Sequence, residues 1–212
     1  MNTKHIATWT FLALLLPALA GCIEAAVVGI GAGAMMATDR RPSDTYLTDQ
    51  VIELRADNGI GEKYPNTVHV NITSYNRLVL ITGEVPDAAT KADIEKIVSS
   101  KPNVKSTQNE LRISGISSLG SRGNDALITG KVKARFIDYG KFPSHLVKVV
   151  TEGGSVYMMG LVTRNEGDAA TEIASGTSGV LGVVKVFEYI SPEEASRLDN
   201  HPASEAAKAP VR

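Results

Sequence analysis

The sequence predicts an α+β fold in which two tandem αββαβ units each pack their helices on one face of a small, mixed, three-stranded sheet. Two observations carry this prediction. Leu78–Val85 (LVLITGEV) and Ser155–Val162 (SVYMMGLV) are apolar runs that end in Gly-x-Val, and their glycines, Gly83 and Gly160, are 77 residues apart. Each run also stands at the same place in a repeated succession of helix-like and strand-like segments, which indicates an internal repeat.

The first unit, residues 44–113, opens with a helical pattern. Leu47, Val51 and Leu54 fall at i, i+4 and i+7, which predicts an apolar stripe that faces the sheet. Asp44 is the candidate N-cap of this helix. The remaining elements follow in the order strand, hairpin turn, strand, helix and strand: Val70–Thr73, Tyr75–Arg77, Leu78–Val85, Asp87–Ser100 and Lys105–Ile113.

The second unit, residues 124–190, repeats this order. Its opening helix carries an apolar stripe at i, i+4 and i+8, made of Ile128, Val132 and Phe136. Asn124 or Asp125 is its candidate N-cap. The remaining elements are Val147–Val150, Glu152–Gly154, Ser155–Val162, Glu166–Ser175 and Val183–Ile190.

Composition separates the units from the rest of the chain. Residues 114–123 (SGISSLGSRG) are rich in glycine and serine, which predicts a linker. Residues 191–212 are dominated by proline, alanine, serine and charge, which predicts a disordered tail. Gly83 and Gly160 are expected to be structural, at a close helix–sheet approach or a bulge where a side chain would not fit.

The N-terminus has the features of an export signal. Two basic residues precede Ile6–Leu19, which is apolar apart from two threonines and too short to span a membrane. The sequence Leu19-Ala20-Gly21-Cys22 follows and contains the only cysteine of the chain. An ordinary secretory signal would leave this thiol exported and without a disulfide partner. We therefore expect residues 1–21 to be a lipoprotein signal peptide and residues 22–43 a lipidated tether.

The net charge and the placement of potential catalytic or metal-binding residues exclude several classes of function. A net charge of -1 argues against nucleic acid as a partner, because a phosphate-binding surface needs a basic excess. No catalytic grouping is recognisable, and no metal or cofactor is expected, because no His/Asp/Glu cluster has ligand spacing. Strand alternation predicts that His69 is exposed.

Taken together, these features resemble the dual BON-domain lipoproteins of the Gram-negative outer membrane. The segments that carry the resemblance are Leu19–Gly29, Ala37–Asp39, Asn124–Asp125, Ile128–Thr129, Lys131–Val132 and Met159–Thr163. The resemblance implies cleavage before Cys22 and acylation of that cysteine, with palmitate among the acyl groups. Ile23 follows the cysteine in place of an aspartate that would resemble an inner-membrane retention signal, which favours a periplasm-facing anchor in the outer membrane.

The resemblance also implies a function. The family includes a non-enzymatic, division-site-associated lipoprotein that binds anionic phospholipid and supports envelope integrity. Phosphatidylglycerol or cardiolipin would then be the membrane partner. The alternative is an adaptor that binds proteins of the periplasm or outer membrane, such as cell-wall hydrolase regulators or the outer-membrane assembly machinery.

The predicted lipid-binding segment is residues 125–136, on the opening helix of the second unit, where the family's lipid contact lies. On a helical wheel, Leu127 lies off the core stripe and beside basic side chains. The candidate lipid-binding residues are Leu127, Lys131, Lys133, Ala134 and Arg135. The alternative is that Leu127 packs against the first unit and the lysines only keep the helix soluble. The matching helix of the first unit carries Asp49 and Glu53, so we expect it to be a poor partner for anionic lipid.

Overall fold

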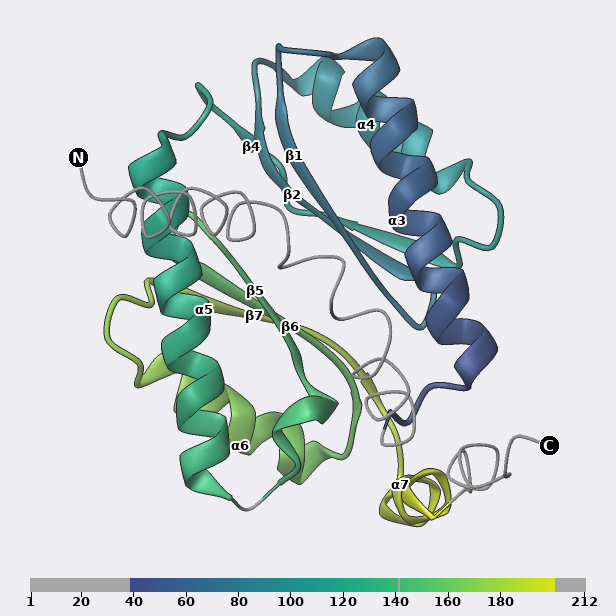
Figure 1. Cartoon of the computed structure of the whole chain (residues 1–212), viewed down its shortest axis with the longest axis vertical. Helices are drawn as coiled ribbons and strands as arrows, with labels where there is room; N and C mark the ends of the chain where they lie inside the picture. Colours follow the sequence, from purple (N-terminus) through teal and green to yellow (C-terminus); the bar gives the residue numbers. More distant parts are fainter. Residues whose placement is uncertain (1–38, 141, 201–212) are drawn as a thin grey trace, which may run out of the picture. The chain divides into compact units, whose positions relative to one another are not determined.

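The computed structural model describes residues 39–140 and 142–200, which form two αββαβ domains (Figure 1). The predicted signal peptide, Cys22 and most of the predicted tether lie outside the described residues, as does the end of the predicted tail. Among the residues that are described, no helix combines the length and apolar character that a membrane span requires.

The first domain has two helices and a mixed sheet. Its elements are α3 (Ser43–Lys63), β1 (His69–Tyr75), β2 (Leu78–Val85), α4 (Ala88–Ser99), β3 (Ser106–Asn109) and β4 (Arg112–Ile113). β2 pairs antiparallel with β1 and parallel with both β3 and β4. The predicted last strand is therefore interrupted, because Leu111 leaves the strand and enters the core.

The second domain repeats this topology. Its elements are α5 (Leu119–Tyr139), η1 (Ser144–Leu146), β5 (Lys148–Glu152), β6 (Ser155–Val162), α6 (Arg164–Ser175) and β7 (Gly182–Tyr189). β6 is the central strand, antiparallel to β5 and parallel to β7. The predicted α+β fold with two repeated units is confirmed, and β2 and β6 have the predicted bounds.

Both predicted hairpin turns are present. Asn76 and Arg77 have φ angles of 51° and 64°, and Gly153 and Gly154 have φ angles of 55° and 77°. A two-residue turn with positive φ at both positions has the twist that antiparallel strands require. The first turn uses residues with side chains where the second uses glycine.

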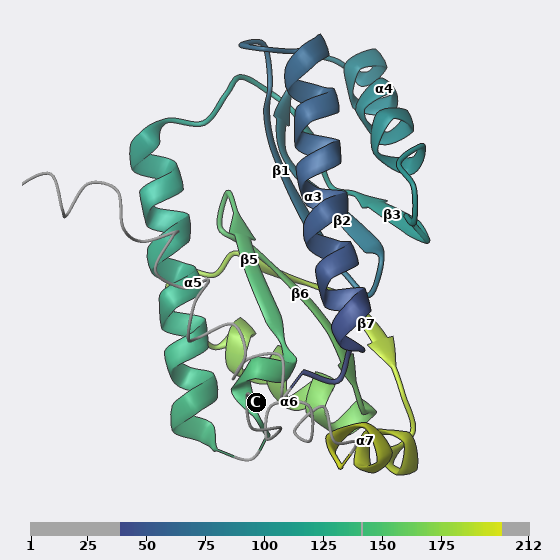
Figure 2. The same cartoon turned by 45° about the vertical axis from the view of Figure 1, so that its right-hand side comes forward.

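In each domain the two helices cover one face of the sheet, as Figure 2 shows for α3 and α4 beside β1 and β2. The first core is built around Ile52, Ala56, Ile60, Val79, Ile81, Ile94 and Val98. The second is built around Ile128, Val132, Phe136, Val156, Met158, Ala170 and Ile173. Burial of these side chains supplies the main driving force for folding each domain.

The other faces of the two sheets pack on each other. Side chains that alternate with the core residues of β2 and β6 form a third apolar cluster with Tyr75 of β1; those from β2 and β6 are chiefly Leu80, Tyr157, Met159 and Leu161. A strand buried on both faces reads as a continuous apolar run. This explains why the central strands were the clearest signals in the sequence.

Three predictions about segment ends were wrong. α5 begins at Leu119, inside the predicted linker, because the Ser118 hydroxyl accepts a hydrogen bond from the amide of Ser121 and caps the helix. Neither predicted N-cap of this helix is used. α3 likewise begins after Pro42, so Asp44 lies within its first turn.

The predicted tail contains a further helix, α7 (Pro192–Asp199). The Ser191 hydroxyl accepts from the amide of Glu194, and proline occupies the first helical position, which is a favourable helix start. The acidic first turn and basic Arg197 near the end also suit the helix dipole.

Candidate functional site

α5 packs on the sheet through the apolar stripe that the sequence predicts. Ile128, Val132 and Phe136 are each at most 1% exposed and belong to the core of the second domain. Asp125 also points inward, where its carboxylate accepts hydrogen bonds from the amides of Gly153 and Gly154 at 2.9 and 2.8 Å. α5 is thus fixed to the sheet by an apolar stripe and by the carboxylate that holds the β5–β6 turn.

The outward face of α5 is apolar. Leu127 is 66% exposed, and Leu119 and Ile137 are 81% and 67% exposed. Between them the exposed face carries small residues: Gly123, Ala126, Gly130 and Ala134. Leu127 does not pack against the first domain, so the alternative that it is buried there does not hold.

The basic candidates on α5 differ in their contacts. Lys131 and Lys133 are exposed on either side of this apolar face, and Ala134 is exposed within it. Arg135 instead donates to the carbonyl of Ile173 at 3.1 Å and to the Thr177 hydroxyl at 2.9 Å. Its guanidinium therefore helps to hold α5 against the end of α6.

One further exposed apolar residue escaped sequence analysis. Leu181 is 83% exposed and lies in the loop between α6 and β7. Its amide donates to the carbonyl of Gly154, and its side chain covers that glycine. Gly154 also donates to Asp125 of α5. Leu181 therefore lies at the same end of the domain as the first half of α5.

The predicted core stripe of α3 was wrong. Leu47, Val51 and Leu54 are 57%, 41% and 61% exposed, whereas the buried residues of α3 are Asp49, Ile52, Ala56 and Ile60. α3 therefore also presents an apolar stripe to solvent.

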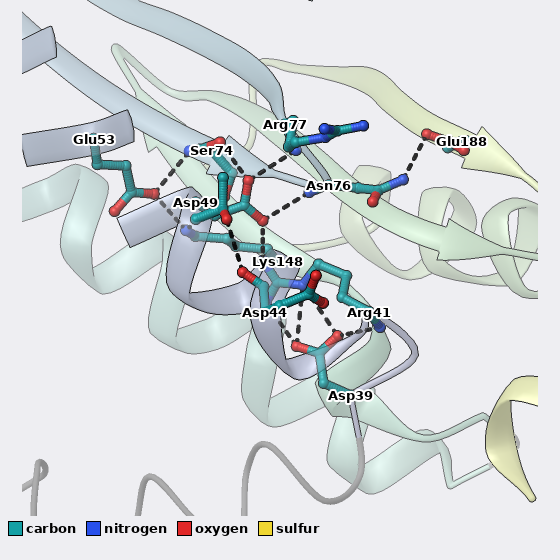
Figure 3. Close-up of polar contacts among 11 residues, drawn as sticks. Asp39, Arg41, Asp44, Asp49, Glu53, Ser74, Asn76, Arg77, Lys148 and Glu188 are labelled. Atoms are coloured by element: carbon teal, nitrogen blue, oxygen red, sulfur yellow. Dashed lines mark hydrogen bonds and ion pairs between the residues drawn. The ribbon is translucent and has the colours of Figure 1, made fainter. Parts of the chain in front are cut away.

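Asp49 determines which face of α3 turns inward (Figure 3). Its carboxylate, fully buried, accepts from the Ser74 hydroxyl at 2.6 Å and from the amides of Asn76 and Arg77 at 2.8 Å. Arg41 Nη1 donates to it at 2.8 Å. Four donors satisfy the buried charge, so Asp49 is a structural residue.

Glu53 also faces inward. It accepts from the amide of Ser74 at 2.7 Å and from the Lys148 ammonium of the second domain at 2.9 Å (Figure 3). Asn76 similarly donates to Glu188 of β7 at 3.0 Å. Both carboxylates are therefore used inside the structure and do not make the outward face of α3 acidic, and the weak affinity of α3 for anionic lipid stays a prediction.

The end of the predicted tether is part of the folded structure. Arg40 and Arg41 are 4% and 7% exposed. Arg40 forms two hydrogen bonds with Glu166 of α6 and two with Asp199 of α7, all between 2.7 and 2.9 Å. Burial opposes the charge of Arg40, but these carboxylates raise its pKa above the ordinary value. Residues 39–41, which directly precede α3, thus contact both domains.

The two repeated glycines allow close approach of neighbouring backbone. Gly83 has a φ of 121°, and a side chain there would collide with the carbonyl group of His69. A Cβ atom on Gly160 would lie 2.5 Å from the carbonyl oxygen of Leu146. Both glycines are therefore needed where the chain that precedes or begins the first strand approaches the central strand closely.

A buried polar cluster lies beside Gly83. His69 Nδ1 is 2.9 Å from Glu84 Oε2 and 4.0 Å from Glu152 Oε1 of the second domain. The His69 side chain is 15% exposed, so the predicted exposure of this residue was wrong. Burial alone would raise the pKa of Glu84, but hydrogen bonds from His69, Ser117 and Arg112 hold it below the ordinary value. Burial raises the pKa of Glu152 despite a hydrogen bond from Asn71.

Comparison with known proteins identifies these two repeats. The model of the BON domain matches residues 43–115 and 124–191. The chain belongs to the BON-domain family. It is 34% identical over 184 residues to the outer membrane lipoprotein DolP of Haemophilus influenzae. The aligned residues cover 84% of this chain and 95% of DolP.

Two further matches were found, one to a curated protein and one to a solved structure. The 21 kDa hemolysin of Actinobacillus pleuropneumoniae is 27% identical over 154 residues, which is 72% of this chain and 79% of the hemolysin. A solved structure of CdsD, a structural protein of the type III secretion system of Chlamydia trachomatis, is 12% identical and covers 70% of this chain and 97% of its own. Its TM-score of 0.28 is too low to support a structural conclusion.

Proposed function

We propose that the chain is a periplasm-facing outer-membrane lipoprotein, anchored through Cys22, whose second BON domain binds anionic phospholipid through α5. The observation that carries this proposal is Leu127, 66% exposed on a helix whose core face is already filled. The lysines that flank the exposed face, Lys131 and Lys133, would meet lipid phosphates. No reaction is proposed.

The physical case rests on the outward face of α5. Its exposed leucines and isoleucine can enter the boundary of the acyl chains, while small residues between them allow the helix to lie close to the bilayer. Each lysine near an anionic membrane contributes about 1 kcal/mol. Arg135 is a weaker candidate because its guanidinium is bonded to α6.

The relatives support the location. The similarity to an outer membrane lipoprotein extends over 84% of the chain and supports the same location for this protein. Acylation at Cys22 would supply the anchor, and α5 would add a second contact that depends on lipid charge. Support of envelope integrity and association with the division site are part of this proposal.

Flotation with liposomes tests the role of α5. Residues 23–212 retain every described residue and lack the acylated cysteine, so any binding occurs without the acyl chains. We expect this protein to float with phosphatidylglycerol liposomes but not with phosphatidylcholine liposomes, and Leu127→Glu to abolish flotation. Val51→Glu, at the corresponding position of α3, is the matched control and should float like the unchanged protein. Both substitutions are on the surface and should change stability by less than about 0.5 kcal/mol.

The exposed stripe on α3 favours a second candidate function, an adaptor that binds other envelope proteins. Leu47, Val51 and Leu54 form an apolar surface that nothing in the described residues covers. Failure to float with either liposome would exclude lipid binding by the folded domains and favour the adaptor. Equal loss of flotation in Leu127→Glu and Val51→Glu would show that binding does not depend on α5 in particular.

A further inference from the structure

Three side chains that are distant in the sequence converge at the contact between the domains. His69 is on β1, Glu84 is opposite it on β2, and Glu152 ends β5. One ligand atom from each lies within 4.8 Å of the others. Glu84 and Glu152 are 1% and 4% exposed, so two carboxylates are buried close to one imidazole.

Neighbouring donors hold both carboxylates, and Glu84 Oε2 also accepts from the Ser117 amide at 3.2 Å. Arg112 Nη2 donates to Glu84 Oε1 at 2.6 Å, and Asn71 Nδ2 donates to Glu152 Oε2 at 2.8 Å. Glu84 Oε2 and Glu152 Oε1 are the oxygens that face His69. Outer donors of this kind orient the ligands of a metal ion and fix which oxygen binds it.

The internal repeat shows that the fold does not require this polar pair. The positions of His69 and Glu84 correspond, 77 residues later, to Leu146 and Leu161. Both leucines are buried, at 2% and 6% exposure. The second domain thus fills the equivalent positions, on η1 and β6, with apolar side chains, and the first domain bears the cost of burying charge there for another reason.

We propose that His69, Glu84 and Glu152 form a binding site for a divalent transition-metal ion that joins the two BON domains. One imidazole and two carboxylates are suitable donors for Zn²⁺ and similar ions, whereas Mg²⁺ and Ca²⁺ prefer sites made of oxygen alone. The ion replaces the proton shared by His69 and Glu84. Its positive charge also balances the negative charge of the buried Glu152 carboxylate.

The geometry requires only small movements. Zn²⁺ bound tetrahedrally at ordinary distances places its ligand atoms about 3.3 Å apart. The distance from His69 Nδ1 to Glu84 Oε2 is 2.9 Å and must increase. The distance from His69 Nδ1 to Glu152 Oε1 is 4.0 Å and must decrease. A pocket of about 350 Å³, lined by His69, Glu152, Asn71 and residues of α5, gives the ion and a fourth ligand water a route from solvent.

Zinc titration of the full chain, purified in detergent, tests the site. We expect one Zn²⁺ per chain by isothermal titration calorimetry, and an increase in melting temperature at about 100 µM Zn²⁺. Co²⁺ should give the visible absorption of a low-coordinate site with nitrogen and oxygen ligands. Glu152→Gln should weaken binding at least tenfold while it preserves the hydrogen bond from Asn71.

The repeat supplies the decisive variant. His69→Leu with Glu84→Leu introduces the pair found in the second domain and should fold while it loses the stoichiometric site. His145→Gln removes an exposed histidine and should bind Zn²⁺ as the unchanged protein does. Unchanged binding in the double variant, or no Zn²⁺-dependent stabilisation of the unchanged protein, would overturn the proposal and leave the cluster as an ion pair between His69 and the glutamates.

Discussion

The two BON domains share one arrangement of helix, hairpin and sheet but differ in how they hold it together. In both, an aspartate on the first helix accepts hydrogen bonds from two amides of the hairpin turn: Asp49 in the first domain and Asp125 in the second. Asp49 additionally binds Arg41 and Ser74. The common carboxylate therefore belongs to the fold, and its extra partners belong to the first domain.

Two sets of equivalent positions carry different residues in the two domains, and both sets include residues with a proposed function. The outward face of α5 combines Leu127 with two lysines, whereas the corresponding face of α3 presents an apolar stripe. At the contact between the sheets, a histidine and a glutamate of the first domain correspond to two leucines of the second. The repeat thus separates what the fold needs from what one domain has added.

Removal of the shared aspartates should have the largest effect on stability. Asp49→Ala leaves two turn amides and the buried Arg41 without this acceptor, and we expect a loss of about 3–5 kcal/mol in the free energy of unfolding. Asp125→Ala leaves only the two turn amides, and we expect a loss of about 1–3 kcal/mol. Urea denaturation followed by circular dichroism measures both. Equal losses would mean that Arg41 and Ser74 add nothing to the role of Asp49.

These aspartates also explain where sequence reasoning succeeded and failed. α5 has one apolar stripe with large side chains, Ile128, Val132 and Phe136, and its inward face was predicted correctly. α3 offers two stripes, and the one that contains Leu47 has larger side chains than the one that contains Ala56. The choice between them depends on Asp49 reaching the turn at Asn76, a contact across 27 residues that helical periodicity cannot reveal.

The polar contacts between the domains were hidden for the same reason. Glu84 lies opposite His69 on the neighbouring strand, but Glu152 of the second domain meets His69 only because the two sheets pack face to face. Arg40 lies in a segment that resembles a tether, and its partners Glu166 and Asp199 are 126 and 159 residues away. Local composition cannot distinguish such a buried arginine from a solvated one.

Arg40→Ala should have the next largest effect, concentrated in the second domain. Arg40 joins α6 to α7, and its removal leaves Glu166 and Asp199 without their shared cation. We expect a loss of about 2–3 kcal/mol and faster amide hydrogen exchange throughout α7. Arg197→Ala is the control, because that arginine is 66% exposed and pairs with Glu194 three residues away. A change of less than about 0.5 kcal/mol is expected for the control.

If α7 exchanges at its original rate in Arg40→Ala, its position depends on its own helix start at Ser191 and Pro192. Loss of protection in α7 would instead show that Arg40 holds α7 in place.

The smallest effects should come from the two buried glutamates, with opposite signs. The pKa of Glu84 is below its ordinary value of 4.5, so its ionised form stabilises the fold above about that pH and the benefit is lost as pH falls through the folded-state pKa. The pKa of Glu152 is raised, so ionisation costs stability as pH rises from about 4.5 through the folded-state pKa.

Glutamine at each position makes this difference measurable. With a chelator present, Glu84→Gln should lower the free energy of unfolding by about 1–2 kcal/mol at pH 7, and the deficit should shrink in acid. Glu152→Gln should leave stability at pH 7 unchanged or higher, and any gain should vanish below about pH 4.5. Urea denaturation from pH 3.5 to 7.5 gives both profiles. A deficit at pH 7 in both variants would mean that Glu152 is stabilised in its ionised form by His69, and that the domain contact is a complete ion pair without a metal ion.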